Sequence, residues 1–171
     1  EGHISSLTFR SGVIDAGQTI TMDPPRDFAS TAEMKVNYLY NKSSFVKKLR
    51  EMDITGDLPD SVTGGLADEF TFHDLRERLK YHAVEHKPLT QSDRLAVEKM
   101  QWLALCNYEA QFDPSVSLSE RVIFPISPSE QNGIEDARFV LFTDEDGSKR
   151  YYATYTAYDG KAVLPQLMET E

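Results

Sequence analysis

The chain has 171 residues, of which 40% are hydrophobic and 27% are charged, and its mean hydropathy is −0.46. This composition is too apolar for a disordered chain and too polar for a membrane protein. The longest apolar run, residues 102–106, is far shorter than the ~20 residues that span a bilayer. We therefore expect a soluble, folded domain with no membrane partner.

The charge balance narrows the class of ligand. The chain has 18 Lys and Arg residues against 28 Asp and Glu residues, which gives a net charge of −10. Binding to nucleic acid phosphates requires a surface rich in Lys and Arg, so we expect no nucleic acid partner. A neutral ligand fits this composition better.

The single cysteine and the first residues of the chain indicate the cellular compartment of the protein. Cys106 has no second cysteine to pair with, and the apolar string WLALC around it favours a place in the core. The first ten residues lack a basic segment followed by an apolar one, so no signal peptide is visible. We expect a cytoplasmic protein, although the start of the chain, which lacks Met, is consistent with trimming.

The chain begins with an extended segment and continues with helical patterns. Apolar and polar residues alternate over residues 4–22 and predict two short strands, and Asp23-Pro24-Pro25 ends this pattern. Ser30 or Thr31 is a suitable cap for a first helix that runs to about Glu51. These patterns predict an N-terminal β segment over residues 1–29 and a helical segment over residues 30–112.

Two further helices are predicted in the helical segment. A loop over residues 53–65 precedes a second helix over residues 66–86. Residues 90–93 have the spacing of a capping box and predict a third helix over residues 94–112. The expected buried face of this third helix carries four residues: Leu95, Trp102, Leu103 and Cys106.

From residue 113 the pattern alternates, as in strands. Strands are predicted over residues 121–125, 138–143, 150–158 and 162–168, with turns at residues 144–148 and 158–160. They predict an antiparallel meander. Neither face of residues 150–158 is charged after Arg150, so we expect both faces to be covered by the helices, by further chain or by another subunit.

Two sequence patterns have simple structural explanations. His82 and His86 in the pattern H-x-x-E-H are spaced to bind one Zn²⁺, with Glu85 activating water, as in inverted zinc peptidases. Two partly exposed histidines near the end of a helix explain the same residues better. The acidic residues 144–147 resemble half of a calcium loop, but an acidic hairpin tip between strands is the better explanation.

The turn before the meander has a catalytic character. Glu135, Asp136 and Arg138 lie where a turn enters a strand, and such a position holds side chains rigidly at a cleft. In regular extended structure Glu135 and Asp136 face opposite sides, whereas Asp136 and Arg138 share a side. The residues alone leave two readings open, a catalytic site or a surface turn with one Asp–Arg pair.

Residues 119–160 resemble the first catalytic blade of glycoside hydrolase family 130, the β-mannoside phosphorylases and mannosidases. The resemblance is carried by G-x-E-D-x-R at residues 133–138 and by Y-x-T-Y-T-A-Y-D-G at residues 152–160. It covers about a quarter of the chain and is fainter at residues 107–109. The helical region 30–106 resembles an insertion or extension present in some members, and we assign it no role.

This resemblance implies a five-bladed β-propeller with its active site in the central pocket. It implies an inverting reaction on β-linked mannosides, with no cofactor and with water or inorganic phosphate as the nucleophile. Asp136 matches the family's general acid, which in phosphorylases is thought to act through a sugar hydroxyl. The resemblance also suggests five residues as sugar-binding or site-organising contacts: Arg121, Asn132, Arg138, Tyr158 and Asp159.

Two features depart from the family pattern. Ala137 stands where many members have Pro, and the sequence stops at Glu171, near the expected start of a second blade. The family's phosphate-binding residues come from later blades, and one blade alone exposes its apolar faces. We therefore expect residues 113–171 to form a first blade that is inactive alone, and the remaining propeller or another subunit to cover it.

Two other functions stay open. The chain can be a non-catalytic carbohydrate-binding or assembly domain, which would bind an oligosaccharide without turnover. It can also be a zinc peptidase that uses His82 and His86, and this is the weaker alternative.

Overall fold

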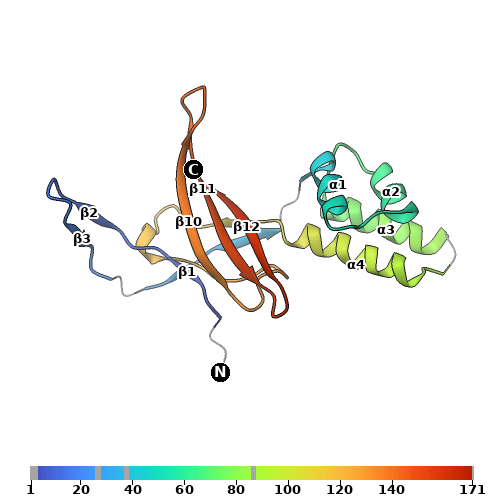
Figure 1. Cartoon of the computed structure of the whole chain (residues 1–171), viewed down its shortest axis with the longest axis horizontal. Coiled ribbons are helices and arrows are strands. Elements are labelled where there is room, and N and C mark those ends of the chain that lie inside the picture. Colours follow the sequence, from blue (N-terminus) through green and yellow to red (C-terminus); the bar gives the residue numbers. More distant parts are fainter. Residues whose placement is uncertain (1–3, 26–27, 37–38, 86–87, 171) are drawn as a thin grey trace. The chain divides into compact units, whose positions relative to one another are not determined.

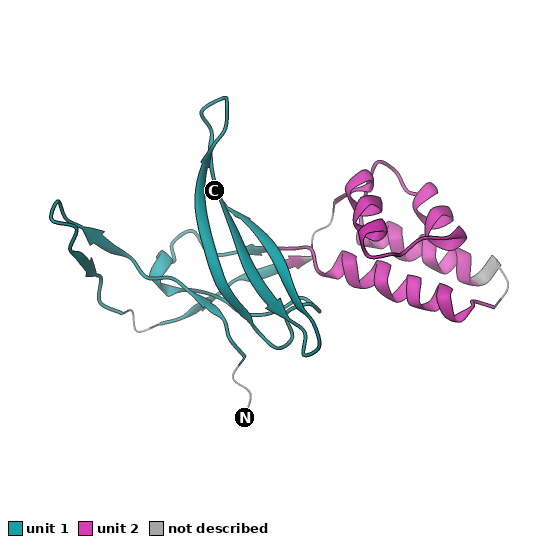
Figure 2. Cartoon of the chain, viewed as in Figure 1, with its two compact units in different colours: residues 1–34, 110–171 teal, residues 35–109 magenta. Residues whose placement is uncertain are grey.

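The computed structural model describes residues 4–25, 28–36, 39–85 and 88–170. The chain forms two compact units, one of residues 1–34 and 110–171 (unit 1) and one of residues 35–109 (unit 2), as Figures 1 and 2 show. Strands β5 (Glu33–Val36) and β8 (Tyr108–Gln111) pair with each other where the chain leaves unit 1 and returns to it. The first residues of the chain and the C-terminal strands therefore belong to the same unit. The sequence-based boundaries lie at 29/30 and 112/113.

Unit 2 is helical, with one small two-stranded sheet. Its strands β6 (Tyr40–Asn41) and β7 (Glu69–Phe70) pair antiparallel. Its described helices are α1 (Lys42–Glu51), α2 (Asp57–Gly64), α3 (Phe72–Glu85) and α4 (Gln91–Leu105). The core of the unit contains three aromatic rings in mutual contact, those of Tyr40, Phe45 and Phe70.

The first predicted helix is wrong at its start. Helix α1 begins at Lys42, where the side chain of Asn41 accepts a 3.0 Å hydrogen bond from the backbone N–H of Ser44. Part of the preceding segment forms β4 (Ser30–Thr31) and β5 instead. These strands pair with β9 and β8, which lie about 75 to 90 residues away in the sequence, and helical spacing carries no sign of such distant partners.

The other helices differ from the prediction at their ends. Helix α2 lies in the segment predicted as a loop, and α3 starts at Phe72 instead of residue 66. The capping box of Thr90 and Asp93 is confirmed, and α4 begins at Gln91 and ends at Leu105. Its buried residues include Ala96, Met100 and Leu103, whereas Leu95 is 51% exposed, so the predicted face was wrong at that position.

Unit 1 is built from strands, and its largest sheet is the predicted antiparallel meander. The three strands of the meander lie in the order β10 (Ile134–Thr143), β11 (Lys149–Tyr158) and β12 (Val163–Thr170). Strand β9 (Arg121–Ile123) pairs with β1 (Leu7–Thr8) on one side and with β4 on the other. A separate hairpin joins β2 (Gly12–Ile14) and β3 (Ile20–Met22). The short helix η1 (Leu118–Glu120) precedes β9.

Among the described residues, the meander packs on one face only. Ile134, Tyr155 and Ala157 are buried and form a core with Ile123 of β9. On the opposite face Val140 is 60% exposed and Leu167 is 68% exposed. This second face is exposed in the described residues, and the expectation that further chain or another subunit covers it stays a prediction. The mixed α and β fold class is confirmed, and no helix in the described part is long and apolar enough to cross a membrane.

Candidate functional site

The two sequence motifs lie on neighbouring strands. The residues of G-x-E-D-x-R begin β10, and those of Y-x-T-Y-T-A-Y-D-G end β11 (Figure 1). The backbone N–H of Asn132 donates a 2.8 Å hydrogen bond to the carbonyl of Tyr158, and the N–H of Tyr158 donates a 3.0 Å bond to the carbonyl of Gly133. The pairing therefore extends from the strands into the turn before β10.

A β-bulge interrupts β10 at Asp136. Glu135 pairs with Thr156 and Arg138 pairs with Thr154, so two residues, Asp136 and Ala137, stand opposite one residue of β11. Asp136 has a φ of 56°, in the left-handed region that Asp tolerates better than most residues. Because residues two apart on β11 share a face, Glu135 and Arg138 share a face as well. The side-chain alternation expected for a regular strand is therefore wrong here.

The carboxylates of the motif have different surroundings. Asp136 is exposed, and within the described part of the chain neither Asp136 nor Arg138 takes part in an ion pair. Glu135 accepts a 2.8 Å hydrogen bond from the hydroxyl of Ser5. The bulge separates Asp136 from the regular register, so the Asp–Arg pair of the surface-turn interpretation does not form.

Asn132 and Asp159 flank the same end of the hairpin. The side chain of Asn132 lies so close to Gly160 that a Cβ atom there would meet Oδ1 of Asn132 at 3.0 Å. Oδ1 of Asp159 accepts hydrogen bonds of 2.7 and 2.8 Å from the N–H groups of Ala162 and Lys161, which lower the pKa of Asp159 below its ordinary value. Asp159 thus shapes the turn that holds Gly160 against Asn132, and Tyr158 remains 40% exposed.

Arg121 lies in a separate environment. Its Nε and Nη2 donate hydrogen bonds of 3.2 and 3.1 Å to the carbonyl of Val116, and its guanidinium lies 5.3 Å from the centre of the Phe112 ring. These contacts hold Arg121 to the segment that precedes β9. The structure therefore brings Asn132, Asp136, Arg138, Tyr158 and Asp159 onto one hairpin end and gives Arg121 local partners instead.

A buried polar cluster beside the motif was not singled out from the sequence. Glu130 is fully buried, and Ser127 and Ser129 are nearly so, with their hydroxyl oxygens 2.7 Å apart. The available signal was the spacing S-x-x-E at Ser127 and Glu130, which is typical of a capping box. The carboxylate does accept the N–H of Ser127, at 3.0 Å.

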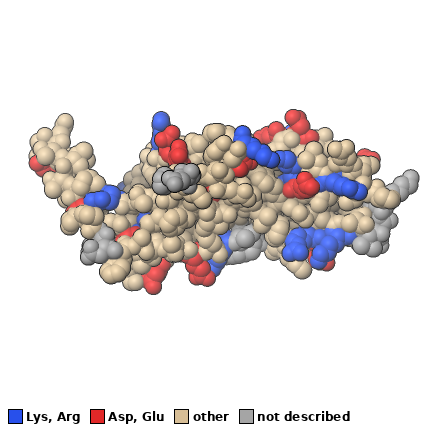
Figure 3. All heavy atoms as spheres, turned by 90° about the horizontal axis from the view of Figure 1, so that it is seen from below, with Lys and Arg blue, Asp and Glu red and all other residues tan. Residues whose placement is uncertain are grey.

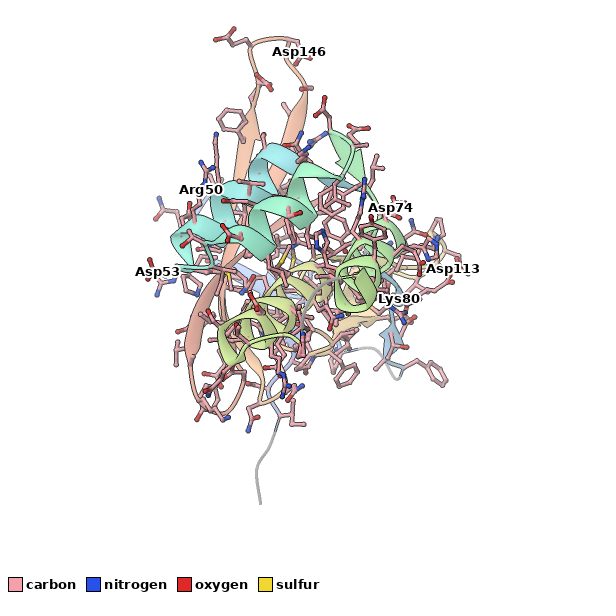
Figure 4. The ribbon with its side chains drawn as sticks, turned by 90° about the vertical axis from the view of Figure 1, so that its right-hand side faces the viewer. Arg50, Asp53, Asp74, Lys80, Asp113 and Asp146 are labelled. Atoms are coloured by element: carbon pink, nitrogen blue, oxygen red, sulfur yellow. The ribbon has the colours of Figure 1, made fainter. Side chains whose placement is uncertain are left out.

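The predicted acidic hairpin tip is present. In the turn between β10 and β11, Oδ1 of Asp144 accepts the N–H of Glu145 at 2.7 Å and Oδ1 of Asp146 accepts the N–H of Ser148 at 2.8 Å. Figure 4 labels Asp146 at this tip. Side-chain and backbone hydrogen bonds from Ser148 lower the pKa of Asp146. These hydrogen bonds give the acidic residues a structural role in the turn.

The histidine pair is described at one of its two positions. His82 is buried on α3, and its Nε2 lies 3.2 Å from the hydroxyl oxygen of Ser61, so the expectation of a partly exposed ring is wrong for His82. His86 lies outside the described residues. Among the residues that the structure describes, no three His, Cys, Asp or Glu side chains are grouped so that they could hold a metal ion. Cys106 is half-buried and caps the end of α4.

The end of the β10–β11 hairpin offers a mixed set of polar groups. Asp136 provides an exposed carboxylate and Arg138 a guanidinium. Asn132 adds an amide and Tyr158 a phenol. Such a set can donate to and accept from the hydroxyl groups of a neutral, polar ligand. No protein-family model matches this chain, and neither the curated proteins nor the solved structures contain a match.

Proposed function

We propose that this chain supplies the first catalytic blade of an inverting glycosidase or glycoside phosphorylase that acts on β-linked mannosides. The resemblance of residues 119–160 to family 130 motivates the proposal. The pairing of β10 with β11 supports it, because two motifs separated in the sequence lie side by side with Asp136 at a bulge between them. This adjacency is the observation on which the proposal depends.

Asp136 is the proposed general acid. The bulge sets this residue apart from the ladder of β10, and its side chain is open to a ligand. An inverting enzyme needs an acid on one side of the anomeric carbon and a nucleophile, here water or phosphate, on the other. We assign Asn132, Arg138 and Tyr158 to sugar contacts, and Asp159 to the turn that positions them.

The proposal requires a partner for the meander. Catalysis by a carboxyl group requires surroundings that exclude water, and Asp136 is exposed in this chain. The exposed face around Val140 and Leu167 is suited to packing against a neighbouring blade. We therefore propose that the remaining propeller, from the same protein or another subunit, completes the site and supplies its cationic residues.

The test uses the full-length protein and β-1,4-mannobiose, with and without inorganic phosphate. We expect bond cleavage with inversion, and Asp136→Asn should lower kcat/KM by at least about 100-fold. Asp146→Asn, at the exposed hairpin tip, is the matched control and should leave kcat/KM unchanged. Full activity of Asp136→Asn would refute the role of Asp136.

A non-catalytic carbohydrate-binding domain is the second candidate. The exposure of Asp136 favours it for the chain taken alone, because an exposed carboxyl group can form hydrogen bonds with sugar hydroxyls without the water-excluding surroundings that catalysis requires. Calorimetric titration of the 171-residue chain with mannobiose distinguishes the two. Saturable binding without any cleavage, also in the full-length protein, would favour this candidate.

A further inference from the structure

Ser5 lies against the turn that leads into β10. It forms an isolated parallel bridge with Gly133, and its carbonyl accepts a 3.2 Å hydrogen bond from the backbone N–H of Ile134. A Cβ atom on Gly133 would lie 3.1 Å from the backbone nitrogen of Ser5, so the two backbones are in close contact. The hydroxyl of Ser5 donates a 2.8 Å hydrogen bond to Oε1 of Glu135. Ser5 therefore contacts three consecutive residues, and Asp136 follows directly after them.

The position of Ser5 is fixed by a strand outside the meander. Further along the chain, β1 begins with Leu7, which pairs with Ile123 of β9. Ile123 belongs to the same core as Ile134, and Leu7 packs against this core. Strand β10 lies at the edge of the meander, beside β11. Ser5 therefore gives the start of β10 hydrogen bonds in addition to those from β11.

Asp136 has a backbone conformation that its neighbours must maintain. Its φ of 56° lies in the left-handed region, which is unfavourable for residues that carry a Cβ atom. The register of β10 on β11 shifts between Glu135 and Arg138, so Asp136 has no pairing partner on β11. Such a conformation persists only where the surrounding contacts determine it. The contacts just before the bulge are the pairing of Glu135 with Thr156 and the hydrogen bond from Ser5 to Glu135.

Glu135 depends on Ser5 for its orientation. Charged side chains of both signs are scattered over the face that Figure 3 shows, among many uncharged ones. Within the described residues Glu135 takes part in no ion pair, and its side chain accepts its hydrogen bond from Ser5. The hydroxyl of Ser5 therefore sets the position of the carboxylate that directly precedes Asp136.

We propose that Ser5 is a positioning residue for Asp136. It holds Glu135 and the turn so that Asp136 keeps its left-handed conformation and presents its carboxyl group to the sugar. The effect on catalysis rests on the proposed function, whereas the effect on the backbone of Asp136 is measurable without a ligand. The hydrogen bond joins residues 130 positions apart, so no local pattern in the sequence indicates it. Because a displaced catalytic group slows the reaction, loss of the hydroxyl should lower kcat rather than raise KM.

The first test is NMR spectroscopy of the 171-residue chain without a ligand. At a positive φ the amide and α protons of a residue lie close together, so Asp136 should give a strong intraresidue cross-peak. The Ser5→Ala variant should weaken this cross-peak about twofold, because Asp136 then samples other conformations. The amide signals of β11 and β12 check that the meander stays folded.

Ser6→Ala is the matched control for Ser5→Ala. The hydroxyl of Ser6 makes no hydrogen bond to a described residue, so this variant should leave the cross-peak of Asp136 unchanged. An unchanged cross-peak in Ser5→Ala, or an equal weakening in both variants, would overturn the proposal.

The second test measures cleavage of β-1,4-mannobiose by the full-length protein. Ser5→Ala should lower kcat about fivefold, the typical contribution of one hydrogen bond, and should change KM less than about twofold. Ser6→Ala should leave both constants unchanged. A Ser5→Ala variant with an unchanged kcat, or with a higher KM alone, would overturn the proposal.

Variants of Glu135 show whether Ser5 acts through this residue. Glu135→Gln keeps an oxygen acceptor for the hydroxyl of Ser5, and Glu135→Ala removes it. Ser5→Ala should lower kcat about fivefold when combined with Glu135→Gln and should have no further effect when combined with Glu135→Ala. An equal loss in both combinations would overturn the proposed route through Glu135. If the unmodified full-length protein does not cleave mannobiose, the proposed function fails, and the NMR comparison alone decides whether Ser5 positions Asp136.

Discussion

The phenol of Tyr155 donates a 2.6 Å hydrogen bond to Oε1 of Glu130, and this bond ties β11 to the connection that leads into β10. Oε2 of the same carboxylate accepts 3.0 Å hydrogen bonds from the N–H groups of Ile126 and Ser127. A fully buried carboxylate is costly unless its oxygens are bonded, and here both oxygens are. Glu130 therefore fixes the turn that carries Asn132 and Gly133 against the strand that carries Tyr155.

Replacing Glu130 should destabilise unit 1. Glu130→Ala removes the acceptor of at least three buried or partly buried donors, and we expect the free energy of unfolding to fall by about 3 kcal/mol. Tyr155→Phe removes one of these bonds and should lower the free energy of unfolding by about 1.5 kcal/mol. Urea unfolding followed by circular dichroism measures both.

Glu120→Ala is the matched control for Glu130→Ala. Glu120 closes a similar capping box, with Oε2 accepting the N–H and the hydroxyl of Ser117, but it is only half-buried. Glu120→Ala should lower the free energy of unfolding by about 1 kcal/mol. Equal losses of unfolding free energy in the two alanine variants would contradict the prediction that the buried Glu130 contributes more stability than Glu120.

Gly133 should tolerate no side chain. Its φ of 128° is unfavourable for any residue with a Cβ, and that atom would crowd the hydroxyl of Ser5 and lie 3.1 Å from its backbone nitrogen. Gly133→Ala should therefore lower the free energy of unfolding by about 3 kcal/mol. Gly147→Ala, at a φ of 85° with open space around it, should cost about 1 kcal/mol. Similar losses at both positions would show that Ser5 does not confine Gly133.

The sequence predicts best those elements whose signals are local. The meander follows from alternation over residues 138–168 and from the turns at residues 144–148 and 158–160, and α4 follows from the capping box of Thr90 and Asp93. Strands β4 and β5 were predicted as helix because their pairing partners lie far along the chain. Local propensity gives no sign of such partners.

The candidate site was predictable to the same degree. The adjacency of the two motifs follows from the hairpin, so Asn132 and Tyr158 come together as the turn implies. The bulge at Asp136 could not be predicted from the alternation of apolar and polar residues. Its position depends on the register in which β10 pairs with β11, and the sequence of β10 alone does not give this register. The burial of Glu130 could not be predicted either, because it depends on the phenol of Tyr155 in a later strand.

Acid should weaken the helical unit through two capping carboxylates. Backbone and side-chain hydrogen bonds from Thr71 lower the pKa of Asp74 at the start of α3, and bonds from Thr90 lower the pKa of Asp93 at the start of α4 (Figure 4 labels Asp74). A lowered pKa in the folded state contributes stability above the unfolded value of about 4, and this contribution is lost as the pH falls through the folded value. The fluorescence of Trp102, the only tryptophan, reports unfolding of this unit.

The control for the acid prediction replaces both carboxyl groups. Asp74→Asn with Asp93→Asn keeps an oxygen acceptor at each cap and removes the titration. We expect this variant to lose less stability than the unmodified chain between pH 5 and pH 3. An identical loss in both proteins would assign the acid sensitivity to other groups.

Alkali should weaken the same unit through Tyr40. The phenol of Tyr40 is buried and donates a 2.9 Å hydrogen bond to the carbonyl of Ala104, and burial raises its pKa from 10.0 to about 12. The stability contributed by the neutral phenol is complete below pH 10 and is lost as the pH rises to about 12, because only the unfolded chain ionises readily in that range. The loss of unfolding free energy should reach about 2 kcal/mol, measured by urea unfolding with Trp102 fluorescence.

Tyr40→Phe should be less stable at pH 7 by about 1 kcal/mol but should lack this alkaline loss. Tyr81→Phe, at an exposed tyrosine of α3, should retain it, so an equal alkaline loss in all three proteins would contradict the assignment to Tyr40.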